Sequence, residues 1–252
     1  KAVEQINFVH KSQAEHTQLE SIKKDLTVAR DIQQYILPQD FPPFPEDTDK
    51  MDIAASMVAA KDIGGDFYDF FRIYDDRTAF VIADVCGKSI PAALFMAVSR
   101  TIIRSKGIGT GAAECMTLSN SLLTAYSIDY MFVTVFYAIY NQRTGEMTWC
   151  NAGHNPPLLM RADGTIEELP RSNDRMLGAF EDITYHEYSL QLGHGDTLVM
   201  YTDGVNEAKD TTGSSFGIDR FKSAVSKSSG KSSQQVIDAV KGDVADFVGD
   251  TE

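Results

Sequence analysis

The chain has few cysteines, little positive charge and no long hydrophobic run. Its three cysteines, Cys86, Cys115 and Cys150, are widely spaced and form no CxxC pair. Such a set argues against a disulfide framework or a cysteine zinc site and is typical of reduced cytosolic thiols. Lysine and arginine number 23 against 36 aspartates and glutamates, so the net charge is −13. This charge argues against nucleic acid or an anionic membrane as the main partner.

Neither a signal peptide nor a membrane-spanning segment is predicted. The longest mostly apolar run covers residues 130–140, far short of the ~20 residues that a spanning helix needs. We therefore expect a cytoplasmic location without direct membrane contact. Because the first residue is Lys1 rather than methionine, we interpret the sequence as part of a longer protein, such as the cytoplasmic part of a sensor.

Residues 1–37 contain no glycine or proline and are predicted to form a helix. Apolar residues recur in it at steps of three and four, the a/d spacing of a coiled coil. The predicted seam, which includes one polar residue, consists of Leu19, Ile22, Leu26, Ala29, Gln33 and Ile36. Fewer than three good heptads leave two interpretations open. The helix either packs on its own domain or joins two chains in a weak homodimer that transmits a signal.

After this helix, residues 38–50 are rich in proline and are predicted to be a stiff linker, and residues 51–252 to be one domain. Nine strands are predicted: 51–59, 67–74, 78–84, 130–140, 146–151, 157–161, 165–169, 184–190 and 197–202. Most of them are predicted to be joined as hairpins, including the last two. The predicted helices come in two pairs, 90–106 with 112–126 and 218–227 with 233–248. These patterns predict an α+β fold in which helices cover antiparallel sheet.

Three aspartates stand beside glycine or at the end of a predicted strand: Asp66, Asp84 and Asp203. Asp66 and Asp203, taken singly, are typical of turns, where aspartate beside glycine is common. If the fold brings the three together, their carboxylates repel one another. A bound Mg²⁺ or Mn²⁺ ion removes this repulsion, because both metals prefer oxygen ligands. The pattern therefore predicts a carboxylate metal site of one or two ions.

Five motifs occur in a fixed order after the lead-in ARDIQQYILP at 29–38. They are GGDFYD (64–69), DVCGKSIPAALFM (84–96), NAGHNPP (151–157), GD (195–196) and YTDGVNEA (201–208). Together they resemble the bacterial SpoIIE-like branch of the PPM metal-dependent serine/threonine protein phosphatases. The resemblance covers the chain from about residue 19 to its end. Five motifs over ~200 residues are a specific signal, although each alone is weak.

The resemblance implies a sandwich of two antiparallel β-sheets flanked by helices and preceded by the N-terminal helix. It also implies two Mn²⁺ or Mg²⁺ ions that activate a water for attack on phosphoserine or phosphothreonine. Asp84 would bridge the ions, the Val85 backbone carbonyl would be a further ligand, and Asp66 and Asp203 would supply the remaining oxygens. The implied substrate is a phosphorylated protein similar to an anti-sigma factor antagonist.

Other residues of these motifs are predicted to support the site. Asp69 is interpreted as structural or as a support behind the metal ligands, because it lies three residues beyond Asp66 on a predicted strand and so faces the opposite side. Asn206 and Glu207 are interpreted as stabilising the turn of Asp203. For His154 two interpretations stay open: a buried side chain that bonds to the backbone, or a catalytic group.

Two departures from the family pattern affect the prediction of activity. Ser89 stands where the family has glycine, and the chain ends where the family continues into a final strand with an Asp-Asp-x-Thr sequence. We therefore expect a domain without that final strand. The alternative function is a phosphatase-like module that binds a partner without hydrolysis, acting as a dimerising signalling relay.

Overall fold

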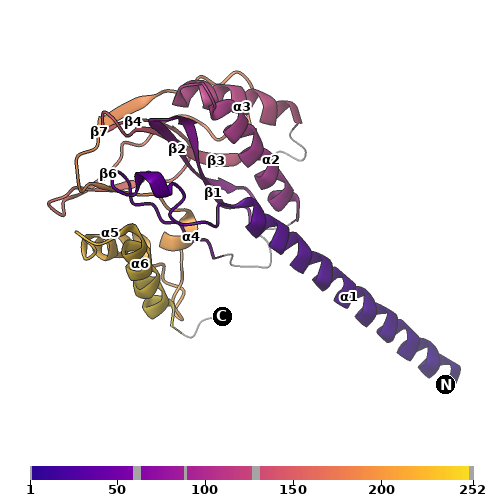
Figure 1. The fold of residues 1–252 in the computed structure, drawn as a ribbon. Coiled ribbons are helices and arrows are strands. Elements are labelled where there is room, and N and C mark those ends of the chain that lie inside the picture. The colour runs from indigo at the N-terminus through magenta and orange to yellow at the C-terminus, as the bar shows by residue number, and fades with distance from the viewer. Residues whose placement is uncertain (1, 59–63, 88–89, 127–130, 250–252) are drawn as a thin grey trace.

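The computed structural model describes the backbone of residues 2–58, 64–87, 90–126 and 131–249 (Figure 1). The predictions on Ser89 and on the chain end at 250–252 lie outside the described residues. Within the described ranges, no helix combines the length and the apolar character that a membrane crossing requires.

Helix α1 (Ala2–Ile36) is a single long helix, as predicted, and most of it extends away from the rest of the molecule (Figure 1). Its C-terminal end packs on the domain, where Gln33 is 5% exposed and Leu37 4%. Leu19, at the other end of the predicted seam, is 58% exposed. The polar residue of the seam therefore faces its own domain, whereas Leu19 remains open to solvent.

The proline-rich segment that follows α1 lies against strand β1 (Phe67–Tyr74) and includes the short 3₁₀ helix η1 (Pro45–Asp47). The ring centroids of Phe41 and Phe44 lie 5.6 and 6.3 Å from that of Phe70. Arg72 pairs with Asp47 and stacks over the ring of Phe44, with its guanidinium carbon 4.4 Å from the centroid. The segment thus contacts β1 between Phe41 and Asp47, while most of its residues stay exposed.

Two antiparallel sheets form the centre of the domain, which confirms the predicted sandwich. The first has the order β1-β2-β3-β4-β7, and the second the order β6-β5-β8. The remaining strands are β2 (Arg77–Val85), β3 (Val133–Asn141), β4 (Glu146–Ala152), β5 (Leu158–Met160), β6 (Ile166–Glu168), β7 (Tyr188–Gln191) and β8 (Thr197–Val199). The predicted hairpins β1–β2, β3–β4 and β5–β6 are present.

The predicted hairpin between residues 184–190 and 197–202 is wrong. Strand β7 pairs with β4 in the first sheet, and β8 pairs with β5 in the second. The reason is burial between the sheets, where the ring of Tyr188 stacks on Trp149 with 4.6 Å between centroids. Stacking of Tyr188 on Trp149, its partner on β4, therefore stabilises the observed pairing. The loop between β7 and β8 crosses from one sheet to the other.

The strand predicted at residues 51–59 is also wrong for residues 51–58, the part that the structure describes. This segment uses polar groups elsewhere. Asp52 accepts a hydrogen bond from the Ser233 backbone N–H at 2.6 Å through its carboxylate, and one from Ser233 Oγ at 2.7 Å through its carbonyl. Asp52 thus contributes these acceptors to the start of helix α6 (Ser233–Val248) rather than to a neighbouring strand.

Helices cover the outer face of each sheet. Helices α2 (Ile90–Gly107) and α3 (Ala112–Tyr126) pack on the five-stranded sheet, and α5 (Gly217–Ser226) and α6 on the three-stranded sheet. The short helix α4 (Asp203–Asn206) was not predicted. The result is a four-layer sandwich with a hydrophobic core in each of its three interlayer spaces.

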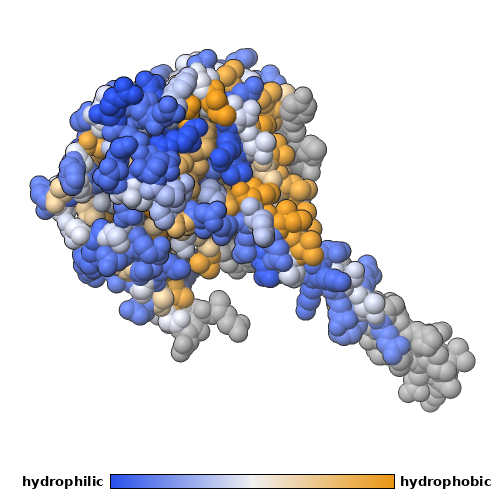
Figure 2. Space-filling model, in the orientation of Figure 1, coloured by the Kyte–Doolittle hydropathy of each residue, from blue (hydrophilic) through white to orange (hydrophobic). Residues whose placement is uncertain are grey.

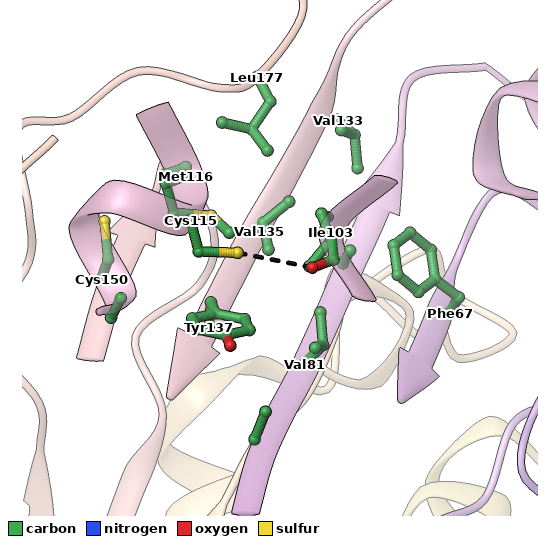
Figure 3. Close-up of a cluster of buried hydrophobic side chains, with 14 of the residues drawn as sticks. Phe67, Val81, Ile103, Cys115, Met116, Val133, Val135, Tyr137, Cys150 and Leu177 are labelled. Carbon is green, nitrogen blue, oxygen red and sulfur yellow. Dashed lines mark hydrogen bonds between the residues drawn. The ribbon is translucent and has the colours of Figure 1, made fainter. Parts of the chain in front are cut away.

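Strand alternation sorts side chains between these cores. On β3, Val135 and Tyr137 face α2 and α3, whereas Phe136 faces the other sheet. Figure 3 shows the first core, where Cys115 Sγ lies 3.5 Å from the Ile103 carbonyl oxygen. Strands β1 to β4 are therefore mostly buried along both faces, which supports their ends from two sides.

Candidate metal centre

Asp66 and Asp84 lie beside each other at one end of the first sheet. The pairing of Phe67 with Ala83 places Asp66 opposite Asp84 at the end of the β1–β2 ladder. Phe67 and Ala83 point into the core under α2. Because successive residues of a strand alternate between faces, the two aspartates are directed toward the other side, where the second sheet lies.

The Val85 carbonyl is held against the backbone before Asp66. A Cβ added to Gly65 would lie 2.6 Å from the Val85 carbonyl oxygen and 3.1 Å from the Val85 Cβ. No side chain fits in this gap, which explains the glycine of the GGD motif. Asp66, Asp84 and the Val85 carbonyl are thus neighbours, and carboxylate and carbonyl oxygens are the ligands that Mg²⁺ and Mn²⁺ prefer. These residues fit the predicted metal.

His154 connects this end of the first sheet to the segment before Asp203. Its Nδ1 lies 2.9 Å from Thr134 Oγ1, and Thr134 is the β3 residue that pairs with Asp84. Its Nε2 lies 3.1 Å from the Tyr201 carbonyl oxygen. Burial lowers the pKa of His154 to about 4, although the Tyr201 carbonyl and the charge of Asp66 act in the opposite direction. His154 is therefore neutral near pH 7, and the structure supports the backbone-bonding interpretation.

Asp203 is the first residue of α4 and is exposed. Its carbonyl accepts a hydrogen bond from the Glu207 backbone N–H at 2.8 Å, so the backbone of Glu207 closes the turn, as predicted for that residue. The side-chain oxygen of Asn206 is buried and has no hydrogen-bond partner among the described residues. A buried acceptor of this kind is available to a bound water or ion.

The structure does not gather all the predicted ligands into one group. In the described ranges, no set of three or more His, Cys, Asp or Glu side chains is close enough to hold a metal ion. Asp66, Asp84 and Val85 are brought together, and Asp203 is linked to them through Tyr201 and His154. The four-residue ligand set stays a prediction.

Two contacts between the N-terminal segment and this site were not predicted from the sequence. The side-chain amide of Gln33 bonds to both the carbonyl and the N–H of Gly64, the latter at 3.2 Å. Tyr68 donates a hydrogen bond from its hydroxyl to the Pro38 carbonyl at 2.9 Å. The signal for the first contact was the polar glutamine within an apolar seam. Helix α1 is thereby tied to the loop that leads into Asp66.

The contacts of Asp69 fit the structural one of its two predicted roles, and the sequence did not reveal its partners. Its carboxylate is buried and accepts hydrogen bonds from Arg104 Nη1 at 2.7 Å and from Arg100 Nη2 at 3.1 Å. The Phe70 backbone N–H adds a third, at 2.9 Å. The two arginines belong to α2, which follows the Asp84 loop, so Asp69 fixes that helix to β1.

The chain is similar in sequence and in fold to known proteins. The profile of the family Stage II sporulation protein E (SpoIIE) matches residues 74–252. The phosphoserine phosphatase RsbU of Bacillus subtilis is 32% identical over 197 residues, which are 77% of this chain and 57% of RsbU. The chain spans between about a third and just over half of the length of the curated relatives it matches.

Solved structures share the fold at lower identity. The SiaA-PP2C domain of Pseudomonas aeruginosa superposes with a TM-score of 0.76 at 18% identity and covers 92% of this chain and 93% of that one. RsbX, solved in complex with magnesium, superposes with a TM-score of 0.58 at 17% identity and covers 73% of this chain and 81% of that one. With the family profile matched over most of the sequence, this chain belongs to the SpoIIE family, the SpoIIE-like branch of the PPM phosphatases.

Proposed function

We propose that this chain is a metal-dependent serine/threonine phosphoprotein phosphatase. The observation that carries the proposal is the end of the first sheet, where Asp66, Asp84 and the Val85 carbonyl meet. Membership of the SpoIIE family supports it, as does the name of RsbU, a phosphoserine phosphatase. In the proposal, the ligands are Asp66, Asp84, Val85 and Asp203, and the substrate is a phosphorylated protein similar to an anti-sigma factor antagonist.

The residues of the chain divide the work of this site. Two Mn²⁺ or Mg²⁺ ions, when bound, supply an activated water and neutralise the phosphoryl oxygens of the substrate. Asp66 and Asp84 present carboxylate oxygens at the end of strands β1 and β2, which are mostly buried along their length, so the backbones that carry these oxygens are supported on both faces. His154 remains neutral and adds no positive charge to compete with the metal for the carboxylates.

Replacement of a predicted ligand tests the activity. We expect Asp84→Asn and Asp203→Asn to lower Mn²⁺-dependent release of phosphate from a phosphoserine protein by about a hundredfold, since each removes an anionic oxygen donor. Asp163→Asn is the matched control, because Asp163 lies in the exposed turn between β5 and β6, and it should keep wild-type turnover. Wild-type turnover in either ligand variant would disprove the ligand assignment.

A second candidate is a phosphatase-like module that binds a phosphorylated partner without hydrolysing it. It is favoured by the finding that no three candidate ligand side chains cluster within the described ranges. The same assay separates the two. A wild-type chain that binds the phosphoprotein but releases no phosphate at any Mn²⁺ concentration would support the second candidate.

The proposal includes regulation through the N-terminal segment and a weak homodimer. In it, residues 1–37 are a signalling helix, 38–50 a linker and 51–252 the phosphatase domain. The bonds of Gln33 to Gly64 and of Tyr68 to Pro38 support such coupling, because a shift of α1 would pull on the backbone that precedes Asp66. The proposal also includes a cytoplasmic location, which the three free thiols support.

A further inference from the structure

We propose that His154 is a positioning residue that ties the Asp203 turn, which follows one sheet, to strand β3 of the other, where Thr134 pairs with Asp84. The two aspartates belong to different layers of the sandwich. Asp84 lies in β2 of the first sheet, whereas Asp203 follows β8 of the second. His154 lies in the connection between β4 and β5, which passes from the first sheet to the second.

The hydrogen bonds of the ring identify one tautomer. The Tyr201 carbonyl, 3.1 Å from Nε2, can only accept, so Nε2 carries the hydrogen. Burial keeps the ring neutral, so Nδ1 carries none and accepts from the Thr134 hydroxyl at 2.9 Å. Because one hydroxyl hydrogen serves one acceptor best, the longer approach of Thr134 to the Asp84 carbonyl, 3.4 Å, is secondary. The ring thus links β3 to the residue two positions before Asp203.

The backbone of His154 is itself fixed. Asn151 accepts the His154 backbone N–H at 2.7 Å and donates to the His154 carbonyl at 3.0 Å. Gly153 has a positive φ of 74°, and a Cβ there would lie 3.2 Å from the Met176 backbone nitrogen. The ring therefore projects from a rigid turn, and the Asn-Ala-Gly-His sequence has a physical reason at each polar or glycine position.

The hydrogen bonds of His154 to Thr134 and to Tyr201 form a tether between the two sheets. At its other end, Tyr201 is held by packing. Its ring lies 4.5 Å from that of Phe221 between centroids, in the core under α5. Its carbonyl points to His154, and the turn of Asp203 begins two residues later. Loss of the Nε2–H bond would leave the carbonyl buried and unpaired, so the segment would have to shift to satisfy it.

Two amide substitutions at position 154 test this tether. The side-chain nitrogen of glutamine can take the place of Nε2, whereas that of asparagine, one methylene shorter, reaches only the place of Nδ1. We expect His154→Gln to keep the Asp203 turn closed and His154→Asn to open it. The readout is hydrogen exchange at the backbone N–H groups of Val205 and Glu207, which bond to the Thr202 and Asp203 carbonyls.

In the Asn variant, these two amides should exchange about tenfold faster than in the wild type. The Leu192 amide, which bonds to Gly145 at the far hairpin, is the internal reference. His186→Asn is the control substitution at a histidine outside the site, and it should leave Val205 and Glu207 unchanged. Wild-type protection in both the Gln and the Asn variant would overturn the proposal. An equal loss of protection in both would overturn the role of the Nε2–H bond, because the shape of the ring would then hold the turn.

The prediction for Mn²⁺ binding rests on the proposed function, whereas the prediction for hydrogen exchange does not. In calorimetric titration with Mn²⁺ alone, the Asn variant should bind about tenfold more weakly than the Gln variant, as is typical when a residue that orients a ligand is lost. Equal Mn²⁺ affinity would overturn the positioning role toward the metal. If the wild type binds no Mn²⁺ while the exchange result holds, the tether stands and the proposed function fails.

Discussion

At the scale of single residues, the site depends on close approach of backbone to backbone. Gly65 lies so near to Val85 that even a methyl group would collide with its carbonyl oxygen. The chain contains a useful contrast in Gly242, within helix α6, where a Cβ would meet nothing within 4 Å. Substitution of Gly65 therefore tests the lack of space for a side chain, whereas substitution of Gly242 tests only the general effect of glycine on chain entropy.

We expect Gly65→Ala to lower the free energy of unfolding by about 1–3 kcal/mol, because the methyl group forces the β1 and β2 ends apart. Gly242→Ala should raise it by about 0.5–1 kcal/mol, since alanine is the better helix residue and no contact opposes it. Urea unfolding of the two variants measures both effects. If Gly65→Ala also weakens Mn²⁺ binding, the Val85 carbonyl contributes to the metal; unchanged binding would remove it from the ligand set.

At the scale of elements, a buried carboxylate joins α2 to the sheet. Asp69 faces two guanidinium groups, of which that of Arg100 is mostly buried and that of Arg104 is 43% exposed at the side chain. Arg104 also stacks on Phe71, with its guanidinium carbon 5.0 Å from the ring centroid. Since α2 begins a few residues after Asp84, the orientation of this helix and the path of the Asp84 loop are linked.

Asp69→Asn should lower the free energy of unfolding by about 2–3 kcal/mol. This is less than the loss of a fully buried partner, because water reaches Arg104 and compensates part of its charge. Asp76→Asn is the matched control at the opposite end of the β1–β2 hairpin. Asp76 pairs at 3.0 Å with Arg143, whose side chain is 77% exposed, so the expected change is below about 1 kcal/mol. Equal changes in the free energy of unfolding of the two variants, measured in urea, would contradict the role of Asp69 in fixing α2 to β1.

At the scale of the whole molecule, apolar side chains remain exposed where α1 meets the domain. Figure 2 shows a hydrophobic area beside this junction. On α2, Ile90, Leu94 and Val98 are exposed at four-residue spacing, and on α1, Val28, Ile32 and Tyr35 form a second stripe. The stripe on α1 lies nearly opposite Leu19 around the helix. Two different faces of α1 are therefore candidates for contact between chains.

The predicted seam assigns the homodimer to the face of Leu19. We expect Leu19→Asp to shift the chain toward monomer and to change phosphatase turnover, because a charge in a short apolar seam is not compensated. Tyr35→Asp, on the other face, should leave the dimer intact. Sedimentation over a concentration series, with turnover measured on the same samples, tests both. Dissociation by Tyr35→Asp alone would move the interface to the second stripe, and a monomeric wild type would exclude the dimer.

Much of the fold, and the family, could be predicted from local patterns in the sequence. The helical spacing of residues 1–37, the hairpin turns and the motif order predicted α1, three hairpins, both helix pairs and the family. These features depend on interactions between residues close in sequence or on motifs that a family shares, so each is visible in a short window. Strand periodicity alone placed Asp69 on the opposite face from Asp66 but left two roles open for it, a structural one and support of the metal ligands.

Contacts between distant segments decided the rest. The pairing of β7 with β4 is stabilised by stacking of Tyr188 on Trp149, and neither strand shows its partner locally. In the sequence, Gln33 is only a polar residue within an apolar seam; the structure shows that its side-chain amide bonds to Gly64. His154 had two open interpretations because its role depends on Thr134 and Tyr201, 20 and 47 residues away. Sequence patterns thus identified the residues with chemistry, whereas tertiary packing determined which of them meet, because burial and hydrogen bonding act on distances in space.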